Sequence, residues 1–584
     1  YFGFNQLNSV SLIKKYNGFS SGFVNKNNTM VTSVIEQDLI NYDQYRTFGF
    51  NEFNYWLLIR LVNNEYNFSI SNNFEVEQPE PKEIERKVSA NITENLEYLK
   101  SKYNTMLNND VIIREFSMYA LNQNYSCFLI YIDGLSDAIS INDFILRPLM
   151  LRQYKHNDNI KMNLSTYIDN CLIPQNSVKK VQNFSDIFSG INMGDCLIFV
   201  DTLNIAFNID VKKYNQRGID SPSNETIIKG PQEAFVENLR TNTSLIRKIV
   251  NNENLIIETI PVGKISQTKC GICYMKEIAN GDLVAEVKYR LNNLDVDSLL
   301  STGQLEQLIE EDEGYGIPQV ISTERPDKCT KYLLQGRVIV LVNGNPYALI
   351  MPATIEDFLF SPEDTNLRPL LANFLRGIRV IAAFLTLLLP GTYIAITSFH
   401  QELLPTELLF SILSARQNVP FPIIFEILLM EFSFELIREA GLRVPSPIGS
   451  TIGIVGALIL GDAAVNAGIV SPTLIIIVAI TGISSFTIPD FSFGFHLRVF
   501  RFVFILLGFT AGFLGIGVGI FVYISLLCSL KSFGVPYTSP IAPASDSKGN
   551  GYFIPPIWKQ EYRAGFIAPK KEKAQGKISM KWKE

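Results

Sequence analysis

The feature that most constrains this chain is a series of long apolar runs in its C-terminal half. Residues 380–401 contain no Asp, Glu, Lys or Arg, and residues 444–489 contain only Asp462. Residues 502–530 are again free of charge. A helix of about 20 apolar residues crosses a bilayer core of about 30 Å, so these runs predict membrane-spanning helices. Charge-free runs of this length are rare in soluble domains, which disfavours the alternative of buried helices in a soluble core.

The runs leave the number of membrane crossings open. Residues 444–489 can hold two short spans with a break near 468–472, and residues 502–530 are long for one span and short for two. Pro390-Gly391 is expected to kink the first span. Two cytoplasmic ends need an even number of crossings, whereas the simplest count gives five. Either the last segment is a hairpin, or one stretch does not cross fully, and 425–441 is the other candidate.

Basic residues suggest which ends face the cytoplasm. They precede the apolar regions and fill the C-terminal tail, and the positive-inside tendency places such ends in the cytoplasm. The flanking residues are Arg376, Arg379, Arg438, Arg443, Arg498 and Arg501.

Length and composition bound the class of protein. The chain has 584 residues, which is too many for one ordinary core. Its net charge of −6 argues against binding of nucleic acid by the chain as a whole. The seven scattered cysteines fit neither a disulfide framework nor a metal set. We therefore expect a multi-domain membrane protein, in which an α/β N-terminal soluble region precedes an α-helical transmembrane domain.

Shifts in composition predict the domain boundaries. An Asn-rich extension ends in the stretch PEPKE, where proline disfavours helix and indicates a linker. The expected parts are the extension and linker at 1–85, soluble α/β subdomains at 86–225 and 226–375, a transmembrane domain of five or six segments at 376–530, and a basic tail at 531–584. The tail is expected either to attract anionic lipid headgroups or to be plainly solvated.

Local signals predict individual elements of the soluble region. Asn91 is expected to cap a helix that begins there, and residues 230–250 are expected to form a second helix. Asn343-Gly344 predicts a hairpin turn, because both residues tolerate positive φ. Three strand–turn–strand units are expected at 127–141, 195–211 and 336–353.

Residues that could carry enzyme chemistry are sparse. Cys270 and Cys273 look like a redox or metal pair, but they lie in a predicted strand, where residues three apart face opposite sides. We expect them to be buried structural cysteines. His156, His400 and His496 are far apart in the sequence. No nucleotide-binding, zinc or nucleophile motif has the right context, so neither an enzyme nor a cofactor or metal site is expected.

The apolar segment GSTIGIVGALILGDAAVNAGIV offers the sharpest functional pattern. Small residues at every fourth position suit a close helical neighbour; they are Gly453, Ala457 and Gly461. A second stripe would place an apolar ring beside a polar one if several copies surrounded a pore; it holds Val455, Ile459, Asp462 and Asn466. A carboxylate inside a membrane is costly and therefore a functional candidate. The alternative is that Asp462 lies at the interface or caps a helix break near Gly461.

The stretch FEILLMEFSFELIREAG places charge where lipid is expected. Glu431, Glu435 and Glu439 follow at i, i+4 and i+8 and share one helix face beside an apolar stripe. This amphipathic helix fits the membrane boundary or a water-filled vestibule. The carboxylates are expected either to draw cations or to pair with basic groups, such as Arg438 or Arg443 of a neighbouring chain.

Glycines recur in the last apolar run. Gly508 and Gly512, and then Gly515 and Gly519, stand four apart, and this spacing lets helix backbones approach closely. Helix packing is the favoured role, and a gating hinge is the alternative.

Several ordered motifs resemble one family. The region PFPIIFEILLMEFSFELIREAGLRVPSPIGSTIGIVGALILGDAAVNAGIV resembles the membrane core of the A subunits of GerA-type spore germinant receptors. GPQEAFVENLRTNTSLIR, GRVIVLVNGNPYALIMPATIEDFLFSPED and GVPYTSPIAPASD match its pattern too, and the resemblance covers about residues 86 to 570. It implies a multi-pass protein of the spore inner membrane, with the soluble region and the tail in the cytoplasm.

The resemblance also implies partners and a role. A transporter-like B subunit and a lipoprotein C subunit would accompany the chain, which would form a homo-oligomeric ring. Opening of the ring would release monovalent cations and start germination. Carried onto this sequence, the pore candidates are Val455, Leu458, Ile459 and Asp462. The alternatives are a non-conducting signalling or scaffold subunit of the receptor, and a transporter component.

Overall fold

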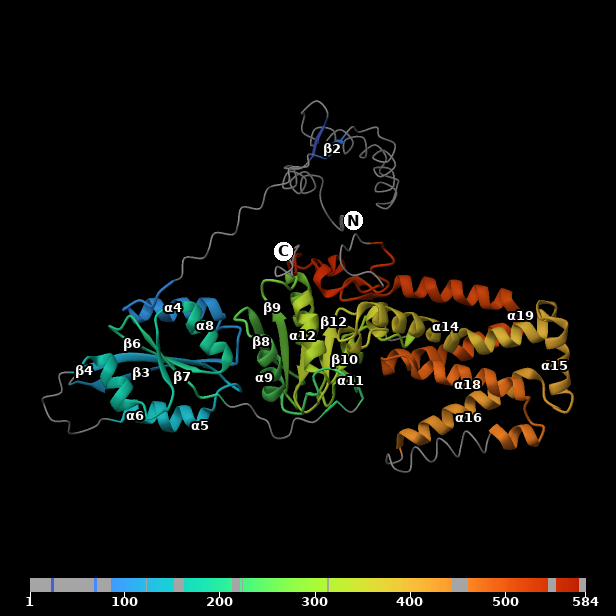
Figure 1. The fold of residues 1–584 in the computed structure, drawn as a ribbon, viewed down its shortest axis with the longest axis horizontal. Helices are drawn as coiled ribbons and strands as arrows, with labels where there is room; N and C mark the ends of the chain where they lie inside the picture. Colours follow the sequence, from blue (N-terminus) through green and yellow to red (C-terminus); the bar gives the residue numbers. More distant parts are fainter. Residues whose placement is uncertain are drawn as a thin grey trace. The chain divides into compact units, whose positions relative to one another are not determined.

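The computed structural model describes most of the chain from residue 86 onward. The described ranges are 86–121, 123–151, 162–212, 221–222, 224–311, 315–443, 461–544 and 553–576, with the strands β1 (Phe23–Asn25) and β2 (Phe68–Ile70). The chain divides into two compact units, Tyr1–Ile84 and Glu85–Glu584. In the first unit β1 pairs with β2 in antiparallel fashion. The other described elements belong to the second unit (Figure 1).

The second unit begins with a five-stranded antiparallel sheet in the order β3-β4-β6-β7-β5. Its strands are β3 (Val111–Ala120), β4 (Gln123–Ile132), β5 (Val178–Val181), β6 (Cys196–Val200) and β7 (Ala206–Ile209). Alternate residues of β4 face opposite cores, with Phe128 on one side and Leu129 on the other. This alternation follows the two-residue period of a strand and lets helices cover both faces.

Helices cover both faces of this first sheet (Figure 1). One face packs against α4 (Ile92–Tyr103) and α8 (Phe184–Met193). The other packs against short helical turns: α5 (Ala138–Ile141), η1 (Asn142–Leu146), α6 (Arg147–Met150), α7 (Leu164–Tyr167) and η2 (Ile168–Leu172).

A second antiparallel sheet has the order β10-β12-β11-β9-β8. Its strands are β8 (Leu255–Val262), β9 (Thr268–Met275), β10 (Ile321–Thr323), β11 (Val338–Val342) and β12 (Ala348–Met351). The helices α9 (Leu239–Ile249) and α12 (Pro326–Gln335) cover one face, and α10 (Gly281–Asn292) and α11 (Thr302–Ile309) cover the other. The region is therefore α/β with antiparallel sheets.

Several local predictions are confirmed. Asn91 caps α4 by accepting a hydrogen bond from the Thr93 N–H at 3.0 Å. The predicted hairpins are β6–β7 and β11–β12, and Gly344 in the second turn has φ of 90°. The predicted break near 468–472 is also present, because α18 begins at Pro472 after a turn.

Two local predictions are wrong. The chain does not form a second strand after Asp133-Gly134, because residues 138–141 form α5, whose first turn is capped by the Asp137 carboxylate. The helix predicted at 230–250 occupies only Leu239–Ile249. The Asn242 side chain accepts from the Val236 N–H and donates to the Val236 C=O, which holds the segment before the helix in a loop.

The remaining helices form one packed region. They are α14 (Pro369–Phe399), α15 (Thr406–Arg416), α16 (Ile423–Arg443), α18 (Pro472–Phe486) and α19 (Phe491–Ser529), with the short turns α13 (Ile355–Phe358), η4 (Pro362–Thr365) and η5 (Gln401–Leu403). Residues 461–466 are also helical. Among the described residues, α14 and α19 are the two helices long and apolar enough to cross a membrane. α14 packs against α18 and α19, and α16 packs against α18.

The helix α19 reverses direction at Gly512, which has φ of 60° and ψ of −139°. His496 Nε2 lies 3.0 Å from Tyr523 Oη, although the two residues are 27 positions apart. In a straight helix that separation would be about 40 Å. The last apolar segment is therefore a helical hairpin. α14 continues as a helix through Pro390, and a Cβ at Gly391 would lie 2.6 Å from the carbonyl oxygen of Phe504 in α19.

The C-terminal segment folds back onto the second sheet. It contains β13 (Lys531–Ser532), β14 (Val535–Pro536), η6 (Ile557–Lys559) and η7 (Gly565–Ile567). Ala564 and Ile567 are buried in the core beneath that sheet. Ile554 exchanges two backbone hydrogen bonds with the Asn373 side chain of α14, at 2.8 and 3.1 Å. Within the described part of the basic tail, Ile567 and Pro569 are buried and residues 570–574 are exposed, so the choice between a solvated tail and one that attracts headgroups stays a prediction.

Candidate functional site

The acidic stripe of α16 takes part in a buried ion-pair cluster. Glu431 Oε2 lies 2.9 Å from Arg501 Nη2 of α19, and both side chains are fully buried, at 0% exposure. The same arginine nitrogen lies 3.0 Å from Glu435 Oε1. Glu435 also contacts Arg438 at 2.8 Å and Arg498 at 3.7 Å. One carboxylate pair from α16 thus faces two arginines from the first arm of α19.

The two arginines of α19 precede the last apolar run, and the sequence predicts a cytoplasmic end there. α19 itself begins earlier, at Phe491, where the Asp490 carboxylate accepts the Phe493 N–H at 2.9 Å. Arg498 and Arg501 therefore lie inside the helix and are buried. Their guanidinium groups pair with the carboxylates of α16.

A second buried carboxylate joins three elements. Glu426 lies off the stripe, as its spacing predicts, and its Oε1 lies 3.1 Å from Arg416 of α15. Its Oε2 accepts a hydrogen bond from the Ser471 N–H, just before α18, at 3.1 Å. Glu439, the last member of the stripe, is exposed.

The predicted pore stripe is described only in part. Asp462 and Asn466 lie in the helical stretch 461–466 and are both exposed in a single copy of the chain. Gly461 has open space where a Cβ would stand. The other candidates of this helix lie outside the described residues; they are Gly453, Val455, Leu458 and Ile459.

The glycines of α19 lie where helix backbones approach closely. A Cβ at Gly508 would clash with the carbonyl oxygen of Gly391 in α14. Gly515 lies against the Leu507 carbonyl, and Gly519 against the Leu507 side chain, so both face the other arm of the hairpin. Gly512 forms the bend itself.

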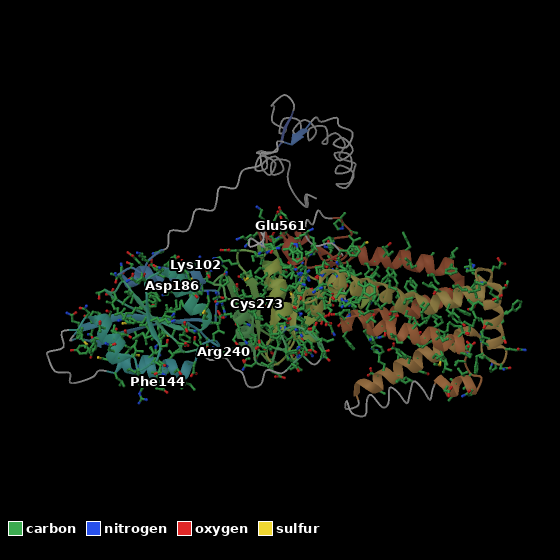
Figure 2. The ribbon with its side chains drawn as sticks, in the orientation of Figure 1. Lys102, Phe144, Asp186, Arg240, Cys273 and Glu561 are labelled. Carbon is green, nitrogen blue, oxygen red and sulfur yellow. The ribbon has the colours of Figure 1, made fainter. Side chains whose placement is uncertain are left out.

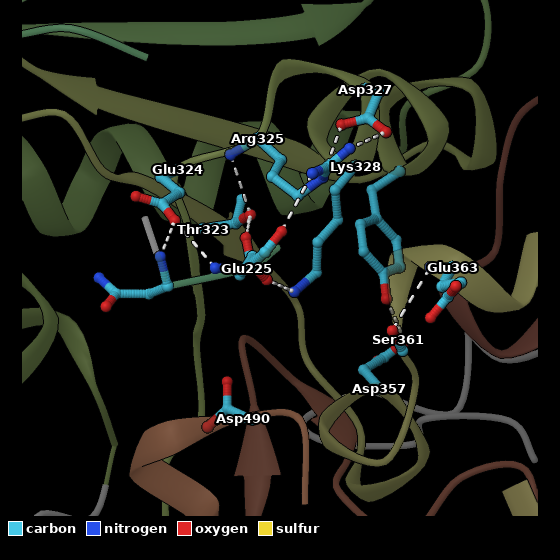
Figure 3. Close-up of polar contacts among 12 residues, drawn as sticks. Glu225, Thr323, Glu324, Arg325, Asp327, Lys328, Asp357, Ser361, Glu363 and Asp490 are labelled. Atoms are coloured by element: carbon cyan, nitrogen blue, oxygen red, sulfur yellow. Dashed lines mark hydrogen bonds and ion pairs between the residues drawn. The ribbon is translucent and has the colours of Figure 1, made fainter. Parts of the chain in front are cut away.

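A polar network holds residues 224–231 against the second sheet (Figure 3). The Glu225 carboxylate lies 2.6 Å from Lys328 Nζ on α12, and its backbone carbonyl accepts from Arg325 Nη1 at 3.0 Å. Glu324 accepts the Glu225 N–H at 2.9 Å. Asp490, the cap of α19, is electrostatically coupled to Glu225 and Lys328. The network therefore lies where the soluble region meets the helices.

The cysteine pair is structural, as predicted. Cys270 and Cys273 lie on β9 and face different cores. Cys273 lies within the region of the second sheet (Figure 2). Burial raises the pKa of both thiols to about 12, so neither is a thiolate at neutral pH. Within the described parts of the chain, no group of three or more His, Cys, Asp or Glu side chains could hold a metal ion.

Comparison with known proteins identifies the family. The model of the family described as Bacillus/Clostridium GerA spore germination protein matches residues 97–566. This chain belongs to the GerA spore germination protein family. The family is that of germinant receptor subunits and is not a known enzyme class.

Relatives of this GerA chain span most of its length. It is 38% identical to spore germination protein KA of Bacillus subtilis over 491 residues, which cover 84% of this chain and 89% of the relative. It is 38% identical to spore germination protein GerLA of Bacillus cereus over 437 residues, which cover 75% and 87%. A crystal structure of the N-terminal domain of the A subunit of the Bacillus megaterium germinant receptor GerK3 shares 29% identity, covers 46% of this chain and 98% of that chain, and has a TM-score of 0.35.

The GerA chain contains one cluster that reasoning from the sequence missed. The stripe at Glu431 and Glu435 was visible from its spacing, but its partners were sought in Arg438 and Arg443 of a neighbour. The signal that pointed to α19 was the pair Arg498 and Arg501, which stand three apart in an otherwise apolar segment and so share one helix face.

Proposed function

We propose that this chain is the membrane subunit of a germinant receptor, which senses nutrients together with partner subunits and forms an oligomeric, nutrient-gated cation channel. It lies in the spore inner membrane, with a transporter-like B subunit and a lipoprotein C subunit. The soluble subdomains at 86–225 and 226–375 and the tail at 531–584 are cytoplasmic. Family membership supports the receptor part of this proposal, and two helices long and apolar enough to cross a membrane support the membrane part.

The observation that carries the channel proposal is the exposure of Asp462 and Asn466 in a single copy. Their neighbours in the sequence are apolar, so lipid would surround both polar side chains if the chain stood alone in a membrane. A carboxylate at that depth costs a few kcal/mol or more. Other copies of the chain or a water-filled pore would remove that cost, and a ring of such carboxylates favours cations.

The hairpin in α19 supports an even number of crossings. Two arms joined at Gly512 bring the end of α19 back to the side where it began. The simplest count of membrane crossings then rises from five to six. With six crossings, the soluble region and the C-terminal segment lie on the same side of the membrane. This agrees with the contacts of residues 553–576 on the second sheet.

A non-conducting scaffold subunit is the second candidate. The observation that favours it is the neutralisation of Glu431 and Glu435 by arginines of the same chain. Carboxylates held in this way do not attract cations to a vestibule. They fix α16 to α19, which suits a subunit that transmits a conformational change.

Germination of spores tests the channel proposal. Val455→Ala should loosen an apolar gate and release monovalent cations without nutrient, because a wider constriction wets more readily. Val499→Ala is the matched control, since Val499 is an exposed residue of α19 that does not belong to the predicted stripe. Equal dormancy and an equal nutrient response in the two variants would contradict the assignment of the gate.

A second variant tests the acidic ring. Asp462→Asn should lower the nutrient-dependent release of potassium, because the ring loses its negative charge. Glu407→Gln removes an exposed carboxylate from the first turn of α15 and should leave the release unchanged. If both variants release potassium as the wild type does, Asp462 is not in the conduction path.

A further inference from the structure

A cavity of about 680 Å³ lies beside the N-terminus of α14, where four parts of the chain meet. The helix α12 contributes Lys331, the first turns of α14 contribute Arg368 and Arg376, and the C-terminal segment contributes Trp558. The loop before η4 contributes Phe360. The channel proposal uses none of these side chains.

The charges on the wall leave the cavity with a surplus of positive charge. Most of its acidic side chains have a basic partner at 2.6 to 3.0 Å; the pairs are Asp327 with Arg325, Asp357 with Arg337, and Asp364 with Arg379. Glu356 differs, because burial raises its pKa to about 7 and leaves it only partly charged at neutral pH. The acids are therefore neutralised or only partly charged, whereas Arg368 adds a full positive charge and Lys331, with a pKa of about 7, adds a partial one.

Lys331 contributes an ammonium group that has no acidic partner among the described residues. Its ammonium lies 3.4 Å from the centroid of the Phe360 ring, and no carboxylate of the described residues lies within ion-pair distance of it. Burial and the nearby Arg376 guanidinium lower its pKa to about 7. A bound anion would compensate both effects, because it would replace lost hydration and offset the repulsion by Arg376.

The first turn of α14 adds further positive charge to the wall of the cavity. Its N-cap, Arg368, makes no side-chain capping hydrogen bond to the helix. The free N–H groups of a first turn carry partial positive charge and bind oxyanions in many proteins. This feature alone would not make a site, but it lies on the same wall as the three cationic side chains.

We propose that this cavity binds a phosphate-class oxyanion, held chiefly by Lys331 and Arg376. A ligand with an apolar part would suit this end of α14, because Trp558 lines the cavity at 45% exposure, and Leu370 and Phe374 in the first turns of α14 are exposed at 78% and 65%. α14 is a candidate membrane helix, so the phosphodiester of an anionic lipid headgroup can reach the site. A soluble phosphate ester has the same chemistry, and the experiment separates the two sources.

The test is equilibrium binding to the purified full chain in nonionic detergent. The probes are sulfate, a soluble tetrahedral dianion, and phosphatidylglycerol in mixed micelles, with phosphatidylcholine as the neutral comparison. Saturable binding of sulfate, or of phosphatidylglycerol over phosphatidylcholine, is the expected result. Binding of phosphatidylglycerol without sulfate would identify a headgroup site, and binding of sulfate would identify a site open to soluble anions.

Variants show whether the cavity is responsible. Lys331→Met should weaken binding about tenfold or more, as expected for the loss of one charge-assisted contact. Lys559→Met is the matched control, because Lys559 is exposed on the neighbouring η6 and does not line the cavity. If Lys331→Met does not fold, Arg368→Gln on the exposed edge replaces it. Absence of saturable binding, or equal effects at positions 331 and 559, would overturn the proposal.

The pH dependence gives a further readout. Sulfate keeps its charge between pH 6 and pH 8, whereas Lys331, with a pKa near 7, loses its proton in that window. Sulfate affinity should therefore fall about tenfold from pH 6 to pH 8. The other charged groups around Lys331 are Arg337, Arg376, Asp357, Asp364 and Glu356. Of these, Glu356 gains negative charge over the same pH range. Lys331→Met should therefore reduce the fall of sulfate affinity with pH without abolishing it.

Discussion

Removal of the Glu431 carboxylate should destabilise the helical region strongly. Both Glu431 and Arg501 are fully buried and lie 2.9 Å apart, so Glu431→Gln leaves a buried guanidinium short of one partner. Breaking a buried ion pair from one side typically costs about 3–5 kcal/mol. Arg501 keeps Glu435 at 3.0 Å, which places the expected loss at the lower end, about 3 kcal/mol.

The assay is the free energy of unfolding of the full chain in detergent micelles, measured by denaturant titration. Glu439→Gln is the matched control, since it makes the same change on an exposed residue of the same helix. It should stay within about 0.5 kcal/mol of the wild type. Replacing both partners, with Glu431→Leu and Arg501→Leu, should cost less than Glu431→Gln alone, because no fully buried charge is left unpaired and Glu435 keeps Arg438 at 2.8 Å. The reasoning is refuted if Glu431→Gln is no more destabilising than Glu439→Gln.

The remaining predictions concern packing and thiol chemistry. Gly391→Ala should destabilise the chain by about 1–3 kcal/mol, because the new methyl meets the Phe504 carbonyl. Gly377→Ala, on the same helix with open space around it, should be neutral or slightly stabilising in the same denaturant titration. Cys270 and Cys273 should resist a thiol reagent at pH 8, whereas exposed Cys171 reacts at once. Fast labelling of Cys273 in the folded chain would contradict its burial.

Elements set by local residues could be predicted from the sequence. The turn at Asn343-Gly344 depends on two residues that tolerate positive φ, and the start of α4 depends on one capping side chain. Both signals are contained in a few adjacent residues. The apolar runs likewise led to the helices of residues 369–529, because length and absence of charge are local properties.

The elements that sequence reasoning missed depend on contacts made elsewhere. Residues 230–238 were expected to be helical, but Asn242 and the network around Glu225 and Arg325 hold them in a loop. Arg498 and Arg501 looked like the end of a membrane segment, because charge in an apolar helix is costly without partners. Their partners lie on α16, more than sixty positions away, and only the fold brings them together.

The proposed anion site could not be predicted for the same reason. Lys331 and Arg376 lie on helices separated by two strands, and Trp558 lies far along the chain. Each residue is unremarkable in its own stretch of sequence. The shared cavity exists because the C-terminal segment folds back to the start of α14 through Asn373 and Ile554.

The measurement that tests the central claim most directly is the ionic current through the reconstituted receptor. The chain would be placed in a planar bilayer with the proposed B and C subunits, and potassium current would be recorded before and after addition of nutrient. We predict a nutrient-dependent cation current that Asp462→Asn reduces. Nutrient binding without any current, in a receptor that still contains all three subunits, would contradict the channel and favour the scaffold.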